Sequence, residues 1–392
     1  MTVSRFSEAN SSISNSKRCR SGSDVGLARF MDTLSGSALR DEPALVHEVD
    51  GFPAKVIERR VVGQDWAQVP EQAEDHPPRV AFFSLKGGVG RSTALFLWGR
   101  HLASQGQTVL LVDLDLGAPG FGAQLLPKAD HPEFGVLDWL VEDLVGNPLA
   151  TSIAQLMVAR TPGSEYPGLY VAPVTGHATE RQPTEFIAKL ARAYLDSGES
   201  GGEGGFADRV RRLCGTLEGH VHPDVVLIDS RAGLHETAAA AVLHLDADVL
   251  LFATDQPPVL AGYRCLLAQL GLMARIFEGK GDDDWRLKFK MVHAKAGEAQ
   301  WELDRYLEHS YRLWLDGLYD KAPAGSDDDR FTFSIGDEAA SHYPLTILAD
   351  PRFERFNPLQ NLTQVGEAAI AGTFWAFAAG LDQRIFGDTD GS

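Results

Sequence analysis

Cysteine, excess positive charge and long apolar runs are all scarce in this sequence, and each shortage argues against a class of protein. The 392 residues contain three cysteines, Cys19, Cys214 and Cys265, and no CxxC pair. This argues against a disulfide framework or a cysteine-rich zinc site and favours a reducing compartment, so we expect a cytoplasmic protein. Asp and Glu number 54 against 36 Lys and Arg, which gives a formal charge of −18. We expect no loose binding to nucleic acid, because phosphates need clustered basic side chains.

No segment predicts attachment to a membrane. The apolar stretch from Ala368 to Leu381 is shorter than the roughly 20 residues that a spanning helix needs. It ends in Asp388 and Asp390 rather than in a basic face, so we expect a core helix there. The first 25 residues lack the apolar core of a secretory leader.

Composition divides the chain into unequal parts. Residues 1–25 are rich in Ser and Arg and are expected to form a disordered tail, and 26–78 a small β-containing flank that ends in a polar linker. Residues 79–385 are expected to form one large domain, with 386–392 as a tail. The hydrophobic content of 44% is enough for a sizeable core.

The large domain shows the rhythm of an α/β fold. Short apolar runs alternate with helical stretches such as Ser92 to Gln105, which predicts a mostly parallel, doubly wound sheet flanked by helices. The predicted strands are Val80 to Leu85, Thr108 to Leu114, Gly168 to Ala172, Asp224 to Asp229, Asp248 to Ala253 and Lys288 to His293.

A glycine-rich loop lies between the first of these strands and the first helix. It consists of Lys86, Gly87, Gly88, Val89, Gly90, Arg91, Ser92 and Thr93. Glycines let backbone N–H groups surround phosphate oxygens, and the helix N-terminus adds its positive dipole end. Ser92 offers a hydroxyl to Mg²⁺, and Thr93 could reach an α-phosphate. Two residues depart from the generic GxxxxGK(S/T) pattern: Leu85 replaces the first glycine and Arg91 the lysine.

The loop resembles the deviant Walker A loop of the MinD/ParA family of P-loop ATPases, in its KGGVGR variant branch. Two further segments resemble that branch. Residues 112–120 (VDLDLGAPG) are similar to VDxDLEAPG, with Gly117 where Glu is common. Residues 227–234 (LIDSRAGL) are similar to LIDSRTGL, with Ala232 in place of Thr. The resemblance covers roughly residues 79 to 385 and says nothing about residues 1 to 78.

The resemblance implies a role for each motif residue. Lys86 would reach the phosphates of a partner subunit across a nucleotide-sandwiched dimer, or it is a solvated loop lysine. Arg91 would contact β- and γ-phosphate oxygens of its own subunit. Because arginine is a planar bidentate donor and lysine a point charge, the exchange leaves open a site that binds nucleotide without hydrolysing it.

Three aspartates complete the implied site. Asp113 would lie near the Mg²⁺ shell and Asp115 on the attacking water, with capping or loop roles as the alternative for either. Asp229 ends an apolar strand, where a carboxylate needs a partner, and would hold Mg²⁺ through water. Arg231 would sense the γ-phosphate or pair with an acid.

Recognition of the base is least defined. The resemblance implies an asparagine that reads adenine near the end of the last predicted strand, but this sequence has none there. His293 or Lys295 would take its place, or these residues lie at the surface. ATP as the nucleotide therefore follows from the resemblance alone.

These features predict an Mg-ATP-dependent switch that dimerises around ATP, hydrolyses it and regulates an unidentified protein partner, in the context of a prokaryotic defence or conflict system. Two alternatives stay open: a nucleotide-binding interaction module without turnover, and a DNA-partitioning ParA-like ATPase.

Overall fold

The protein consists of two compact units, Met1–Gln64 and Asp65–Ser392. The structure, a computed structural model, describes residues 2–5, 45–49, 52–57, 65–67, 76–161, 167–195, 205–276, 284–320 and 330–387. In the first unit, strands β1 (Thr2–Arg5), β3 (Phe52–Ile57) and β2 (Leu45–Val49) form an antiparallel sheet in that order. Strand β1 lies within the stretch expected to be a tail. The rest of that stretch, most of the expected linker and residues 388–392 lie outside the described residues.

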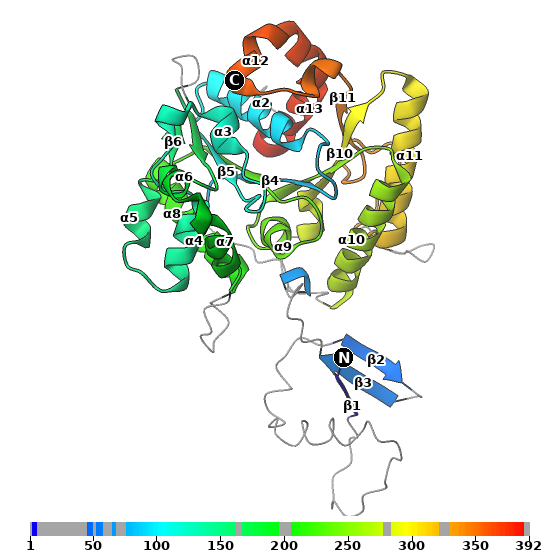
Figure 1. The fold of residues 1–392 in the computed structure, drawn as a ribbon. Coiled ribbons are helices and arrows are strands. Elements are labelled where there is room, and N and C mark those ends of the chain that lie inside the picture. The colour runs from blue at the N-terminus through cyan, green and yellow to red at the C-terminus, as the bar shows by residue number, and fades with distance from the viewer. Residues whose placement is uncertain are drawn as a thin grey trace, which may run out of the picture. The chain divides into compact units, whose positions relative to one another are not determined.

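The second unit is built on an eight-stranded sheet in the order β11-β10-β9-β4-β8-β5-β7-β6 (Figure 1). Neighbouring strands run parallel, except that β6 and β7 are antiparallel, which confirms the predicted mostly parallel sheet. The strands are β4 (Arg79–Ser84), β5 (Val109–Asp113), β6 (Ala159–Arg160), β7 (Leu169–Ala172), β8 (Val225–Asp229), β9 (Asp248–Ala253), β10 (Phe289–Ala296) and β11 (Leu345–Leu348).

Helices cover both faces of this sheet, as the doubly wound prediction requires (Figure 1). One face carries α2 (Arg91–Ser104), α3 (Phe121–Leu125), α12 (Pro358–Val365) and α13 (Glu367–Phe386). The other carries α4 (Val136–Leu144), α5 (Ala150–Ala154), α7 (Phe186–Ala193), α8 (Phe206–Val221), α9 (Glu236–Leu243), α10 (Pro257–Ile276) and α11 (Gln300–Gly317). The remaining elements are α6 (His177–Arg181) and the 3₁₀ turns η1 (Asp65–Ala67), η2 (Lys128–Asp130), η3 (Pro183–Glu185), η4 (Trp285–Lys288) and η5 (Pro351–Phe353).

The apolar strands fit this two-sided burial. In the central strand β4, Ala81 and Phe83 face one core cluster, while Val80 and Phe82 face the other. A strand that is covered on both faces needs apolar residues at every position, and the run VAFF provides them.

Two apolar helices have different burial. By length and composition alone, α10 could cross a membrane. Its residues Tyr263, Leu267 and Leu270 are among those buried in the core. Helix α13, predicted to be a core helix, buries Phe374 and Phe377 but leaves Trp375 65% exposed.

The sheet brings the motif residues to one edge. The loop after β4 and the last residues of β5 and β8 lie at the carboxyl ends of parallel strands, and Asp113 is the register partner of Asp229. Crevices outside these strand ends are where open α/β sheets bind ligands.

Candidate functional site

The loop after β4 has a conformation that only glycines adopt without strain. Gly88 and Gly90 have φ angles of +76° and +89°, in the left-handed region. A Cβ at Gly87, Gly88 or Gly90 would meet no atom within 4 Å, so the space next to these glycines is open. This shape fits a phosphate group held by backbone amides.

The N-terminus of α2 completes the loop. Its N-cap is Gly90, so no side chain caps the helix, and no acidic residue lies in its first turn. The first N–H groups of a helix have no partner within the helix and carry the positive end of its dipole. This end therefore suits an anionic ligand that also contacts the glycine loop.

Leu85, which departs from the generic motif, is accommodated by a glycine in a neighbouring helix. A Cβ at Gly262 of α10 would lie 2.7 Å from the Cδ1 atom of Leu85. The leucine side chain thus packs beneath the loop rather than into its open side, where the next residue, Lys86, is exposed.

Arg91 points into a group of acids and hydroxyls. Its Nε donates to Oδ1 of Asp229 at 2.5 Å, and its Nη1 donates to Oγ of Ser84 at 2.9 Å. Its Nη2 lies 3.6 Å from Oδ2 of Asp115. Ser92 donates from Oγ to the other Asp229 oxygen, also at 2.5 Å. The loop arginine and the loop serine therefore share one carboxylate.

Asp113 is held by the backbone that follows it. Its carboxylate accepts from the N–H groups of Asp115 at 3.0 Å, Phe121 at 3.3 Å and Gly120 at 3.4 Å. Burial, aided by the negative charge of Asp229, raises the pKa of Asp113 to about 7, and the three N–H groups oppose this. Asp113 therefore caps the turn before α3 and also lies beside Asp229. The two roles expected for it, as a cap and as a residue near Mg²⁺, are compatible.

Asp115 lies beyond the end of β5, closer to solvent. Its side chain is 19% exposed, compared with 4% for Asp229. Burial raises the pKa of Asp115, and the positive charge of Arg91 opposes the rise. A partly exposed carboxylate at the edge of the loop is suitably placed to accept a hydrogen bond from water.

Arg231 joins the site from the turn after β8. A Cβ at Gly117 would lie only 2.9 Å from its Nη1 atom, and its charge acts on Asp115. Burial lowers the pKa of His235, and the charge of Arg231 adds to this effect. The ring of Tyr194 packs edge-on against His235, 5.2 Å between centroids.

His293, the residue expected near the base, is buried in β10. Its imidazole stacks on the ring of Tyr306 in α11, with centroids 3.7 Å apart, on the sheet face opposite α2. Burial lowers the pKa of His293 to about 4. Lys295, two residues on, is exposed with a φ of +55°. Whether either contacts a base stays a prediction.

The donor set fits a magnesium ion only after rearrangement. Oγ of Ser92 lies next to the carboxylate of Asp229, and a hydroxyl and a carboxylate are both suitable oxygen ligands for Mg²⁺. Within the described residues, however, no group of three or more His, Cys, Asp or Glu is arranged to hold a metal, and Arg91 contacts the same carboxylate.

Sequence motifs did not reveal Ser84 or Tyr194. Ser84 accepts from Arg91 and donates to the carbonyl of Lys86 at 3.0 Å. Tyr194 directly follows α7 and lies far from every motif along the chain. The position of Ser84 at the end of an apolar strand could have marked it as a site residue. No such signal in the sequence marks Tyr194.

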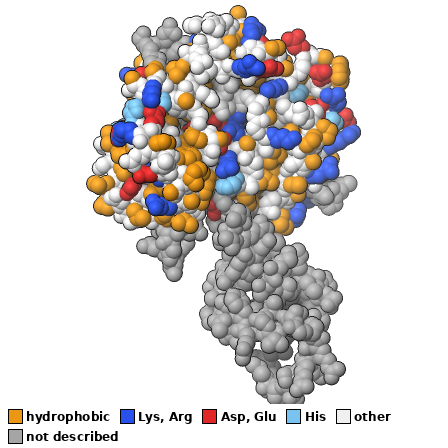
Figure 2. All heavy atoms as spheres, viewed as in Figure 1, with side chains coloured by type: hydrophobic (Ala, Val, Ile, Leu, Met, Phe, Trp, Pro, Cys, Tyr) orange, Lys and Arg blue, Asp and Glu red, His pale blue; other side chains and the backbone are white. Residues whose placement is uncertain are grey.

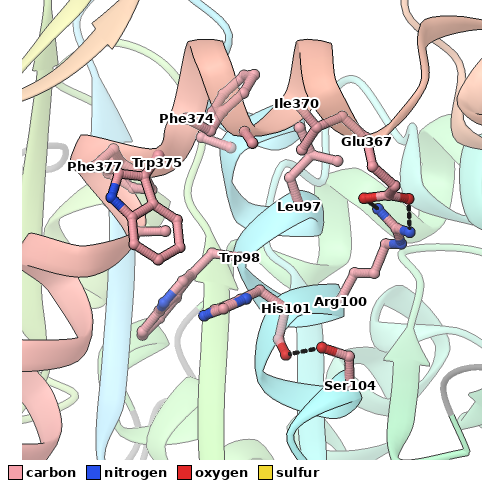
Figure 3. A pocket seen from close by; sticks show the side chains of 13 residues that line it. Leu97, Trp98, Arg100, His101, Ser104, Glu367, Ile370, Phe374, Trp375 and Phe377 are labelled. Atoms are coloured by element: carbon pink, nitrogen blue, oxygen red, sulfur yellow. Dashed lines mark hydrogen bonds and ion pairs between the residues drawn. The ribbon is translucent and has the colours of Figure 1, made fainter.

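A separate cavity of about 510 Å³ lies between α2 and α13 (Figure 3). Leu97, Trp98, Phe374 and Trp375 line its apolar part, and an ion pair between Arg100 and Glu367 closes its polar end. None of the glycine-loop residues lines it, so this cavity is distinct from the site.

No protein-family model matches the chain, and no curated protein matches it. Similar solved structures include MinD of Pyrococcus horikoshii with Mg-ADP, at 16% identity and a TM-score of 0.47, covering 79% of this chain and 97% of that one. A ParA-family ATPase of Chlorobium tepidum has 17% identity and a TM-score of 0.46, covering 78% and 99%. An ATP complex of Cyanothece McdA has 15% identity and a TM-score of 0.45, covering 77% and 96%. The names of the first two are those of the family that the sequence motifs resemble.

Proposed function

We propose that this protein is a P-loop ATPase that acts as a nucleotide-dependent switch. The observation that carries the proposal is the open glycine loop between β4 and α2, with Ser92 bonded to Asp229 at its inner end. The loop and helix end would hold the phosphates, and Ser92, Asp229 and Asp113 would hold Mg²⁺. When bound, Mg²⁺ neutralises phosphate charge.

Asp115 is the residue that would act on water. Its carboxylate is partly exposed, lies 3.6 Å from Arg91 and has a raised pKa. In that position it would accept a hydrogen bond from a water molecule and orient it toward a phosphate at the loop. Arg91 and Arg231 would supply positive charge next to it.

Lys86 supports the proposed homodimer. It is exposed at the outer edge of the loop, and within the described part of the chain it forms no ion pair. A lysine with no carboxylate of its own subunit is free to reach phosphates in a second subunit. ATP would then hold two subunits together, and hydrolysis would release them.

A protein partner is supported by an apolar surface over α4, α5 and α7, visible where hydrophobic side chains gather in Figure 2. In or next to these helices, the exposed large hydrophobic residues are Val145, Leu149, Leu156, Ile187 and Leu195, each 51–72% exposed. Patches of this kind mark interaction sites. The defence context and the cytoplasmic location remain part of the proposal.

The test of turnover is phosphate release by the wild type and by Asp115→Ala. We expect Mg-ATP binding by calorimetry in both proteins and release in the wild type that falls at least tenfold in the variant. Binding with equal background release in both would leave the alternative, a nucleotide-binding module without turnover. No binding of ATP, ADP or GTP would refute the proposal.

The test of dimerisation is light scattering with and without ATP. We expect ATP to raise the mass of the wild type and of Lys128→Ala, another exposed lysine, but not that of Lys86→Ala. An unchanged mass in the wild type would refute the dimer. Retention on DNA at low salt, lost steeply as salt rises, would instead favour the partitioning alternative.

A further inference from the structure

Both carboxylate oxygens of Asp229 are already engaged. Oδ1 accepts from Nε of Arg91 and Oδ2 from Oγ of Ser92, each at 2.5 Å. Ser92 and Asp229 are two of the three side chains that the proposed function assigns to Mg²⁺, and the inference below rests on that assignment. The arginine is 8% exposed, so water screens the pair little.

The guanidinium is also anchored on its other edges. Nη1 donates to Ser84 at 2.9 Å, and Nη2 lies 3.6 Å from Asp115. The donors of this planar fork lie on three nitrogens and reach three separate acceptors, whereas the three donors of a lysine ammonium all lie on one nitrogen. The exchange of lysine for arginine therefore has a structural consequence that needs no nucleotide.

The charge of Arg91 disfavours a divalent cation at the same carboxylate. Asp113 and Asp115 both lie close enough to Asp229 for its negative charge to raise their pKa values. Arg91 is the cation in direct contact with two of them. A divalent cation at Asp229 would lie within a few ångströms of the guanidinium, where like charges in a partly buried site repel strongly.

We propose that Arg91 is the resident counter-cation of Asp229 and bars a divalent metal from this carboxylate until phosphate oxygens draw the guanidinium away. Metal and nucleotide then bind together, and metal alone binds only weakly. Ser84 is a positioning residue in this device, because its hydroxyl links the guanidinium to the carbonyl of Lys86 in the loop.

The experiment is a Mn²⁺ titration without nucleotide, in which electron paramagnetic resonance measures the free ion. We expect Arg91→Met to bind Mn²⁺ about tenfold more tightly than the wild type, a change of about 1.4 kcal/mol. Adding Asp229→Asn to Arg91→Met should abolish the gain. Arg79→Met is the matched control, because it also frees a buried acid, Glu218, but away from the loop.

Circular dichroism establishes whether each variant is folded. If Arg91→Met fails to fold, Arg91→Lys is tested in its place. Lysine keeps the positive charge but loses the contacts that join Asp229, Ser84 and Asp115, so its Mn²⁺ affinity should rise by a smaller factor. At equal concentration, Mn²⁺ should raise the unfolding temperature of Arg91→Met and Arg91→Lys more than that of the wild type.

Equal Mn²⁺ affinity in the wild type and in the folded Arg91 variants would overturn the inference. So would a gain that survives Asp229→Asn. The proposed function is tested by a different measurement. If calorimetry finds no ATP binding by the wild type, the proposed function is wrong, independently of the result of the Mn²⁺ titration.

Discussion

The guanidinium of Arg231 lies against Gly117, so close that a methyl group at this glycine would meet Nη1 at 2.9 Å. The two residues come from different motifs, after β5 and after β8. In the sequences that the chain resembles, glutamate is common at position 117. Here the glycine leaves space that the arginine occupies, and the charge of Arg231 thereby acts on Asp115.

Gly117→Glu should therefore weaken the site without unfolding the protein. Gly117 is exposed and its φ is not in the left-handed region, so we expect the free energy of unfolding to change by less than about 1 kcal/mol. The new carboxylate would pair with Arg231 and draw it from Asp115, and phosphate release should fall. Gly215→Ala, in open space on α8, is the control and should leave release unchanged. Unaltered release in Gly117→Glu would show that Arg231 takes no part.

Gly88→Ala and Gly90→Ala should each destabilise the protein by about 1–2 kcal/mol, because their left-handed φ angles disfavour a side chain. Gly87→Ala is a matched control within the same loop: its φ lies outside that region and its Cβ would meet nothing. Urea denaturation measures the difference. Equal losses at positions 87 and 88 would contradict the argument from φ.

His293 should make the protein sensitive to acid. Burial, opposed by the charge of Asp255, lowers its pKa to about 4 from an ordinary 6.5. Between these values the unfolded chain binds a proton that the folded protein does not, so stability falls as the pH drops from 6.5 to 4, by at most about 3 kcal/mol. His293→Phe keeps a ring on Tyr306, and its unfolding free energy should fall less over this range. Identical pH profiles would refute the assignment.

Arg79 and Glu218 form a buried two-pronged ion pair that ties the start of β4 to α8, with both N–O distances 2.7 Å. Arg79→Met should cost about 3–5 kcal/mol, because it leaves Glu218 buried without a partner. The double variant Arg79→Met with Glu218→Leu should recover most of that loss. Urea denaturation of both variants checks this, and a double variant no more stable than the single one would contradict it.

The sheet and the place of the site could be predicted because both depend on local pattern. Apolar runs such as VAFF mark strands buried on two faces, and the carboxyl ends of parallel strands meet at one edge, which brings Asp113 and Asp229 together. Strands β6 and β11 were missed because β6 has two residues and β11 is mostly half-buried, so neither has a clear apolar run.

The partners of the charged residues could not be predicted. Sequence gives the position of Arg91 along the chain, but the guanidinium can turn toward a phosphate or toward an acid. Its contacts with Ser84 and Asp229 depend on how three strands pack. In the same way, the approach of Arg231 to Gly117 depends on two loops that no local pattern relates.

The large unit begins at the short turn η1, before its first strand β4. Trp66 is 6% exposed and packs against the ring of Phe83, 6.4 Å between centroids, on the strand that leads into the glycine loop. Its carbonyl accepts from Gln269, and that of Asp65 accepts from His244. A shortened chain that starts at Arg79, where the motifs begin, would lack this indole. It would leave a void beneath the loop strand, at a loss of about 3–5 kcal/mol, so a truncation for expression should keep Asp65 onward.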